Sequence, residues 1–258
     1  MSPRRAPRHD HDAGGDASLL QAKAARRDAV WAALDVPGVA RVPKPAGRIP
    51  NFVGAEAAAE QLAGAPEWLA AATVKANPDS PQWPVRTRAL VDGKVVYMAV
   101  PRLAEPEPFF LLDPEQLADA PRAASSIKGA SRSARRVDLD ALEPVDLVVT
   151  GCVAVDRRGA RLGKGGGFSD LELAAAAAAG LVDEHTVVAT TVHPFQVLDA
   201  GDVPTTTHDI HVDLIVTPDE VLRCSRPPGW GLPTIDWSEL TEEKIDAIPL
   251  LGRLRSAR

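Results

Sequence analysis

The sequence carries a six-residue apolar run, Val145-Asp-Leu-Val-Val-Thr150, that returns almost unchanged as Val212-Asp-Leu-Ile-Val-Thr217. Nearly continuous apolar runs of this length are typical of strands buried on both faces of a parallel sheet. A third apolar run covers residues 186–192, and an alanine-rich helix is predicted over residues 171–179, ended by Gly180. The order of strand, glycine-rich loop, helix and strand is that of a βαβ unit. It predicts an α/β fold that binds ligands at the carboxyl ends of its strands.

Further segments with helical or strand periodicity lie on either side of this unit. Residues 1–17 contain almost no large apolar side chains and are predicted to form a disordered tail. Residues 18–258 are then expected to form a single domain. Further helices are predicted from Ser18 onward and over residues 55–63, 84–90 and 238–246, and further strands over 71–75, 94–100 and 109–112.

The composition restricts the class of protein. A chain of 258 residues with 45% hydrophobic and 25% charged residues is typical of a soluble globular protein. No apolar run approaches the ~18 residues of a membrane span. The N-terminal residues show no apolar secretion signal, so the cytoplasm is the expected compartment. Cys152 and Cys224 are too few for a disulfide framework or a cysteine-only zinc site.

Charge is distributed unevenly along the chain. The net charge of −6 makes broad nucleic-acid binding unexpected. Residues 122–136 contain five basic and no acidic residues, among Ser, Gly and Ala, and are predicted to form a flexible cationic loop. Residues 165–222 contain ten carboxylates and no Lys or Arg, which describes either a solvated acidic face or a ligand site. A phosphorylated ligand beside this half would need cations from elsewhere in the chain or a divalent metal.

The segment Arg161-Leu-Gly-Lys-Gly-Gly-Gly-Phe168 has four glycines in five positions. Glycines permit left-handed backbone angles and leave amide groups uncovered, and the helix that follows adds partial positive charge. The pattern is not a Walker A loop, because Gly165 stands where Ser or Thr should bind magnesium, and it does not fit the dinucleotide fingerprint. Flanked by Arg161 and Lys164, the loop is predicted to hold phosphate, with a bare flexible turn as the alternative. Asp170 is placed to bind a cation that bridges the phosphates.

The longer stretch Gly159-Ala-Arg-Leu-Gly-Lys-Gly-Gly-Gly-Phe-Ser-Asp170 resembles the ATP-binding loop of 5-formyltetrahydrofolate cyclo-ligases, or methenyltetrahydrofolate synthetases. The pattern Gly-Lys-Gly-x-Gly-Phe-x-Asp-Leu-Glu resembles the sequences of a divergent branch of that family, which includes the methenyltetrahydrofolate synthetase domain-containing proteins. The resemblance covers the chain from about Leu20 to Leu254. It includes Ala22-Lys-Ala-Ala-Arg-Arg27, Val74-Lys-Ala-Asn-Pro-Asp79, Gly93-Lys-Val-Val-Tyr-Met-Ala-Val-Pro-Arg102, Asp146-Leu-Val-Val-Thr-Gly151 and Val203-Pro-Thr-Thr-Thr-His-Asp-Ile-His-Val-Asp213.

The resemblance implies a fold and a reaction. The fold is a three-layer α/β/α arrangement with a mostly parallel sheet, similar to ribose-phosphate isomerases and CoA transferases. In the reaction, ATP phosphorylates the formyl oxygen of 5-formyltetrahydrofolate, N10 attacks the activated carbon, and phosphate leaves to give 5,10-methenyltetrahydrofolate with ADP. The implied partners are ATP, Mg²⁺ and a reduced folate, with neither a membrane nor a nucleic acid expected.

The resemblance also implies roles for individual residues. Arg161 and Lys164 are expected to act on the transferring phosphoryl group, and Asp170 and Asp209 to hold Mg²⁺. For Lys75, a solvated lysine at a strand end is the alternative to phosphate contact. The residues expected to contact ATP are Lys23, Arg27, Lys75, Gly163, Gly165, Gly166, Gly167, Phe168 and Ser169.

Two residues depart from the family pattern. Phe168 and Ser169 stand where two tyrosines usually precede the aspartate, which removes hydroxyl groups near the phosphoryl group and the folate. A second hypothesis is therefore an ATP-dependent enzyme that acts on another N-formyl or carboxyl compound. A third is a non-catalytic nucleotide-, folate- or RNA-binding module that uses residues 122–136. Tyr97, Met98 and Phe109 are predicted either to line a pterin slot or to belong to the core.

Overall fold

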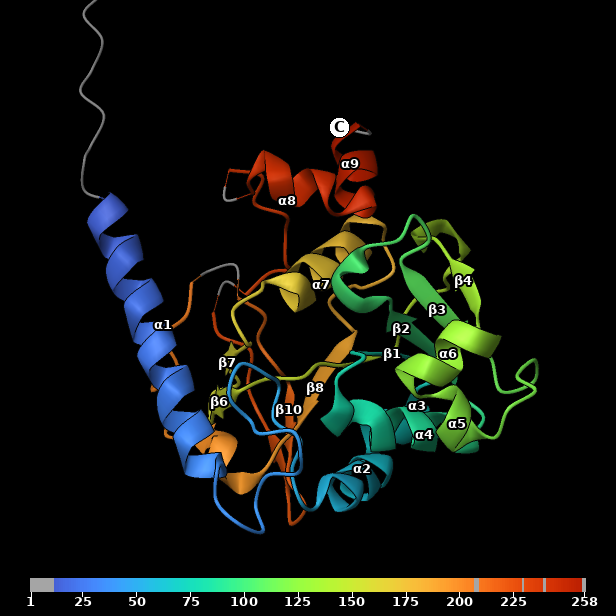
Figure 1. Ribbon diagram of the computed structural model, residues 1–258, viewed down its shortest axis with the longest axis horizontal. Coiled ribbons are helices and arrows are strands. Elements are labelled where there is room, and N and C mark those ends of the chain that lie inside the picture. Colours follow the sequence, from blue (N-terminus) through green and yellow to red (C-terminus); the bar gives the residue numbers. More distant parts are fainter. Residues whose placement is uncertain (1–11, 207–208, 229, 239, 257–258) are drawn as a thin grey trace, which may run out of the picture.

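The computed structural model describes residues 12–206, 209–228, 230–238 and 240–256 (Figure 1). The first helix, α1 (Asp12–Leu34), begins six residues before the predicted start at Ser18. Adding a turn to a formed helix costs far less than nucleating one, so the helix extends into a segment with few large apolar residues. Residues 1–11 of the predicted tail lie outside the described residues.

An eight-stranded sheet forms the centre of the molecule, in the order β11-β10-β8-β5-β1-β2-β3-β4. The five strands from β10 to β2 pair in parallel, and β11, β3 and β4 add antiparallel pairings at the two edges. The two nearly identical apolar runs become β5 and β10, which lie on either side of β8. The strands are β1 (Thr73–Ala76), β2 (Val95–Ala99), β3 (Phe109–Leu112), β4 (Arg135–Val137), β5 (Leu147–Val149), β8 (Val187–Thr191), β10 (Leu214–Val216) and β11 (Val221–Arg223).

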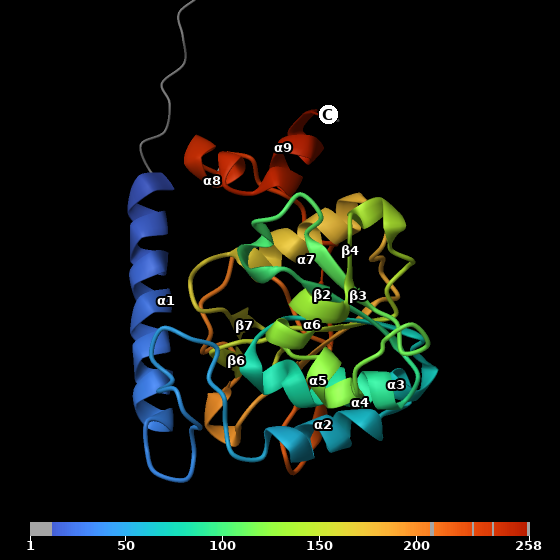
Figure 2. The same cartoon turned by 45° about the vertical axis from the view of Figure 1, so that its right-hand side comes forward.

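Helices cover both faces of the sheet, so the molecule has three layers (Figures 1 and 2). Residues along β2 alternate between the two cores: Val96 and Met98 pack on one face, Tyr97 and Ala99 on the other. One face carries α2 (Ala55–Ala63), α3 (Pro66–Ala70), α4 (Trp83–Val91), α5 (Pro121–Ala124) and α6 (Ile127–Ser133). The other carries α7 (Phe168–Ala178), α8 (Glu242–Asp246) and α9 (Pro249–Ser256). The predicted three-layer α/β/α fold is confirmed.

A second, three-stranded sheet lies beside the first and supports α1. Its strands are β6 (Ala154–Asp156), β7 (Arg161–Leu162) and β9 (Val197–Leu198), in the order β7-β6-β9. Val30 and Leu34 of α1 pack with Ala154 and Leu162 in a separate core cluster. Two of its strands, β6 and β7, are inserted between β5 and α7, and the third, β9, follows β8. The glycine loop therefore follows a strand of the small sheet, while β5, α7 and β8 form the βαβ unit of the large one.

Residues 122–136 are ordered, so the prediction of a flexible cationic loop is wrong. They contribute to α5, α6 and β4. The Oγ of Ser126 accepts a hydrogen bond from the N–H of Gly129 at 2.9 Å and caps α6. Arg132 forms an ion pair with Asp119 at 2.6 Å. A cap and an acidic partner from outside the segment stabilise helices that its basic composition did not predict.

Short 3-10 helices connect several of the strands. They are η1 (Ser80–Gln82), η2 (Pro101–Leu103), η3 (Leu139–Ala141) and η4 (Pro194–Gln196). Among the residues that the structure describes, no helix has the combined length and apolarity needed to cross a bilayer.

Candidate active site

A cleft of about 780 Å³ opens beyond the carboxyl ends of β1 and β2. The glycine loop and the first turn of α7 form one of its walls. This is the edge of a parallel sheet at which ligands bind in open α/β folds. The residues that line the cleft lie within 43–51, 77–80, 99–103 and 161–172, together with Ile127.

The glycine loop leads from β7 into α7 with its amide groups unpaired. Gly165 and Gly167 have φ angles of 106° and 67°, in the left-handed region that side chains disfavour. In the described chain, no backbone N–H from residue 163 to residue 170 donates a hydrogen bond. A row of unpaired amides that ends at a helix N-terminus is a ready site for an anion. The geometry therefore fits a phosphate chain along this wall.

Two cations of α1 lie at this site, one on the loop and one on Asp209. The Nε of Arg27 donates to the carbonyl of Gly163 at 2.7 Å, and the Nζ of Lys23 lies 2.6 Å from the Oδ2 of Asp209. Burial lowers the pKa of Arg27, and the charge of Asp209 opposes that shift. A Cβ on Gly165 would lie only 3.7 Å from the Cζ of Arg27. The structure thus brings Arg27 to the loop and Lys23 to Asp209, from positions four residues apart on one face of α1. Their predicted contact with ATP stays a prediction.

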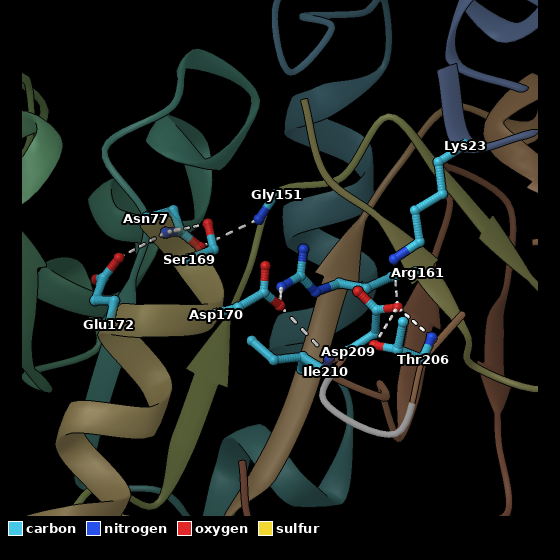
Figure 3. Close-up of polar contacts among 10 residues, drawn as sticks. All are labelled: Lys23, Asn77, Gly151, Arg161, Ser169, Asp170, Glu172, Thr206, Asp209 and Ile210. Atoms are coloured by element: carbon cyan, nitrogen blue, oxygen red, sulfur yellow. Dashed lines mark hydrogen bonds and ion pairs between the residues drawn. The ribbon is translucent and has the colours of Figure 1, made fainter. Parts of the chain in front are cut away.

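Arg161 and Asp170 form an ion pair beside the loop (Figure 3). The side chain of Arg161 is 2% exposed, and its Nε has no hydrogen-bond partner in the described chain. The Oδ1 of Asp170 accepts from Arg161 and from the N–H of Ile210. Its Oδ2 receives no hydrogen bond from any described residue. Asp170 therefore keeps one carboxylate oxygen for a further partner.

The two carboxylates predicted to hold Mg²⁺ differ in what surrounds them. The Oδ2 of Asp209 binds Lys23 and accepts from the N–H and the hydroxyl of Thr206, at 2.6 and 3.2 Å. The Oδ2 of Asp170, by contrast, has no hydrogen-bond donor among the described residues. No group of three or more His, Cys, Asp or Glu side chains is placed to hold a metal within the described ranges. Mg²⁺ commonly takes one or two carboxylates and completes its shell with water and phosphate oxygens. The donor set fits such an ion best at Asp170, with a phosphate ligand present.

Lys75 is not at the cleft surface. Its Nζ lies 2.6 Å from Oε1 of Glu172, and both side chains are 3% exposed. Burial raises the pKa of Glu172, and the charge of Lys75 opposes that shift. Lys75 is absent from the residues that line the cleft, whereas Glu172 is among them. The predicted contact of Lys75 with phosphate does not match this placement, because its charge is already neutralised in the interior.

Lys164 lies at the mouth of the cleft. Its Nζ is 3.2 Å from the Oδ1 of Asp79, and its side chain is 44% exposed. Exposed ion pairs of this kind contribute little to stability. Lys164 can therefore exchange Asp79 for a phosphate oxygen at small cost. Phe168 and Ser169, which replace the expected tyrosines, also line the cleft.

Asn77, which the sequence analysis did not single out, connects three parts of the site (Figure 3). Its Nδ2 donates to the Oγ of Ser169 at 3.2 Å and to Oε2 of Glu172 at 3.1 Å. Its Oδ1 accepts from the N–H of Gly151 at 3.2 Å. Asn77 thus fixes the end of β1 against the start of α7 and the segment after β5.

Arg86 of α4, which is 1% exposed, was also missed. It donates to the backbone carbonyls of Asn77, Asp79 and Ser125, and burial lowers its pKa to about 9. Arg86 thereby holds the turn that follows β1. An arginine on the apolar face of a predicted helix, beside Val85, is the sequence signal that could have identified it.

Tyr97, Met98 and Phe109 belong to the core, each at most 2% exposed, and do not line the cleft. Its apolar lining includes instead Ala99, Val100 and Leu103.

Comparison with known proteins identifies the family of the chain. A sequence model of the 5-formyltetrahydrofolate cyclo-ligase family matches residues 19–218. The chain belongs to this family. The resemblance predicted from the sequence is thereby confirmed.

Relatives in this cyclo-ligase family share more than a third of their aligned residues with the chain. The methenyltetrahydrofolate synthase domain-containing protein of Danio rerio is 38% identical over 235 residues, or 89% of this chain and 60% of the relative. The Mus musculus protein of the same name is 38% identical over 234 residues. The chain thus spans about 60% of the length of the curated relatives it matches. The mitochondrial 5-formyltetrahydrofolate cyclo-ligase of Arabidopsis thaliana matches over 86 residues, at 35% identity and 33% of this chain.

The fold of the cyclo-ligase family is also found among solved structures. The 5,10-methenyltetrahydrofolate synthetase of Aquifex aeolicus superposes with a TM-score of 0.51 at 20% identity. The superposition covers 80% of this chain and 95% of the other. At this level of identity the similarity concerns the fold alone.

Proposed function

We propose that the chain is an ATP- and Mg²⁺-dependent ligase that converts 5-formyltetrahydrofolate to 5,10-methenyltetrahydrofolate, with release of ADP and phosphate. The observation that carries the proposal is the row of amides from residue 163 to residue 170, at the wall of the cleft, which donate to no group of the described chain. Membership of a ligase family supports the class of reaction.

In this proposal the protein binds the triphosphate and neutralises its charge. The loop amides and the N-terminus of α7 donate to phosphate oxygens, and Lys164 leaves Asp79 to contact the transferring group. Asp170, held by Arg161, would be a ligand of Mg²⁺, which reduces the negative charge on the phosphates when bound. Arg27 and Lys23 hold the loop and Asp209 in place from α1.

The rest of the cleft suits a reduced folate. Its volume of about 780 Å³ lies in the range for small-molecule sites. Ile49, Val100 and Leu103 supply apolar surface for a pterin, while Arg48 and Arg102 are exposed and form no ion pair with a described residue. These arginines are suited to the carboxylates of the folate glutamate. Both small molecules would then meet at one cleft.

The test is an assay of purified protein with ATP, Mg²⁺ and 5-formyltetrahydrofolate that follows methenyl absorbance and ADP release. We expect turnover that disappears without Mg²⁺ and falls about a hundredfold in kcat/KM for Lys164→Ala, the typical loss for one charge-stabilising donor. Lys128→Ala, at an exposed lysine of α6, is the matched control and keeps full activity.

Three outcomes contradict the proposal in different ways. Turnover that Lys164→Ala leaves unchanged would show that the loop is not the phosphate site. ATP binding without product would favour another formyl or carboxyl substrate, the hypothesis that Phe168 and Ser169 motivate. If the protein does not bind ATP, the remaining hypothesis is a non-catalytic folate- or RNA-binding module. The cytoplasmic compartment stays a prediction.

A further inference from the structure

The segment after residue 218, where the family match ends, places a cation on the glycine loop. Lys244 of α8 donates from its Nζ to the carbonyl of Gly166 at 3.3 Å. The same Nζ lies 5.8 Å from the ring centroid of Phe168 and 3.3 Å from where a Cβ on Gly167 would stand. Among the described residues, Lys244 has no carboxylate partner. Its charge is therefore directed to the loop alone.

Packing fixes α8 in this position. Thr241 caps the helix, since its Oγ1 accepts from the N–H of Lys244 at 3.2 Å. Ile245, next to Lys244, is 4% exposed and belongs to the core cluster that also contains Leu171 of α7. Arg253 of α9 pairs with Asp138 at 2.7 Å and ties the following helix to the body. The lysine is thus held by the fold and is not a loose surface side chain.

The contact with Gly166 has a consequence for the next amide. In a trans peptide the C=O and the following N–H point in opposite directions. A cation that holds the Gly166 carbonyl on the α8 side directs the N–H of Gly167 away from α8. Arg27 holds the Gly163 carbonyl on the α1 side in the same way. The N–H of Lys164, in the same peptide, therefore points away from α1. Two cations, one from each end of the chain, therefore hold carbonyls of the loop and leave its amides free.

We propose that Lys244 is a positioning residue of the phosphate loop and that the C-terminal segment is part of the ATP site. It orients the Gly166–Gly167 peptide so that its N–H donates to a phosphate oxygen. Phe168, which departs from the family tyrosine, supplies the ring against which the ammonium lies. This inference rests on the proposed function, because it requires that the loop binds the phosphates of ATP.

The experiment compares Lys244→Met, Lys244→Arg and Arg253→Met with the unmodified chain. ATP affinity is measured by calorimetric titration with Mg²⁺, and KM for ATP and for 5-formyltetrahydrofolate by the absorbance assay. We expect Lys244→Met to weaken ATP binding about tenfold, as for loss of a charge-assisted hydrogen bond, with the folate KM and the melting temperature unchanged. Lys244→Arg restores most of the affinity. Arg253→Met loosens the same segment away from the loop and leaves ATP affinity unchanged.

The outcomes separate this inference from the proposed function. Unchanged ATP affinity in Lys244→Met, in a protein that binds ATP and turns over, overturns the inference alone. Equal losses in Lys244→Met and Arg253→Met also overturn it, because docking of the segment and not the lysine would then matter. If the unmodified chain binds no ATP, both proposals fail.

Discussion

At the scale of single residues, the site depends on buried polar side chains whose contacts no sequence motif indicates. Within the motif Val74-Lys-Ala-Asn-Pro-Asp79, the sequence predicts that Lys75 either contacts phosphate or lies solvated at a strand end, and it predicts no role for Asn77. Burial reverses these roles: Lys75 pairs with Glu172 in the interior, and Asn77 ties the end of β1 to α7. A residue type predicts what a side chain can bind, whereas its depth in the fold decides what it does bind.

The burial of the Lys75–Glu172 ion pair predicts how substitutions of either residue change the free energy of unfolding. Glu172→Gln leaves an uncompensated ammonium in the interior and should cost about 3 kcal/mol of unfolding free energy. Lys75→Met combined with Glu172→Gln removes both charges and should recover most of that loss. Urea denaturation of the three proteins measures both changes. A double variant as unstable as Glu172→Gln would show that hydrogen bonds to the carboxylate, and not the charge pair, set the cost.

The environment of the two cysteines predicts how their reactivity depends on pH. Burial is the main cause that raises the pKa of both thiols to about 11, with Cys152 fully enclosed and Cys224 half-buried. The thiolate is the reactive form, so a raised pKa means less of it at any pH below 11. Labelling of the folded protein by a thiol reagent should be slow at pH 8 and accelerate about tenfold per pH unit toward 11. Fast labelling at pH 7 would contradict this environment.

At the scale of elements, periodicity located most helices and strands, including α2, β3 and β8, but not the small sheet. Its strands β7 and β9 have two residues each, too few to show an alternating pattern. The place of α1 also could not be predicted, because Val30 and Leu34 pack against residues more than a hundred positions later. Lys23 and Arg27 are four positions apart, a spacing that places two residues on one face of a helix.

A change in the buried side of α1 should therefore affect a cleft that it does not touch. Leu34 is fully buried, so Leu34→Ala should cost about 2–5 kcal/mol. The same variant should weaken ATP binding, because α1 carries Arg27 to the loop. Leu20→Ala, at a position of the same helix that is 65% exposed, is the control and should change neither property. Denaturation and ATP titration measure the two effects, and unchanged ATP affinity in Leu34→Ala would show that α1 docks independently of that contact.

At the scale of the whole molecule, the arrangement of charge matters more than its total. The chain has a net charge of −6, yet Arg27, Arg161, Lys164 and Lys244 lie in or on one loop and come from three separate segments. Three basic residues of 122–136 lie on α5 and α6, on the opposite side of the sheet from α7 (Figure 1), and the other two, Arg135 and Arg136, lie on the edge strand β4. Composition alone could not distinguish these two groups of cations.

The RNA-binding alternative is tested at this scale. Arg132 and Arg136 already face Asp119 and Glu105. We expect weak affinity for single-stranded RNA at physiological salt, with no change on joint replacement of Arg132, Arg135 and Arg136 by Gln. Fluorescence anisotropy with a labelled oligonucleotide measures this. A clear fall in affinity, with a smaller salt dependence, would instead support an RNA-binding surface.

The glycine loop receives its carbonyl contacts from Arg27 and from Lys244, near the two ends of the described chain. During synthesis, α1 leaves the ribosome before β6 and β7. The apolar side of α1 therefore has no partner until those two strands have been synthesised. The last contact forms only after α8 has emerged. A nascent chain that ends before residue 242 therefore lacks the contact of Lys244 with the Gly166 carbonyl.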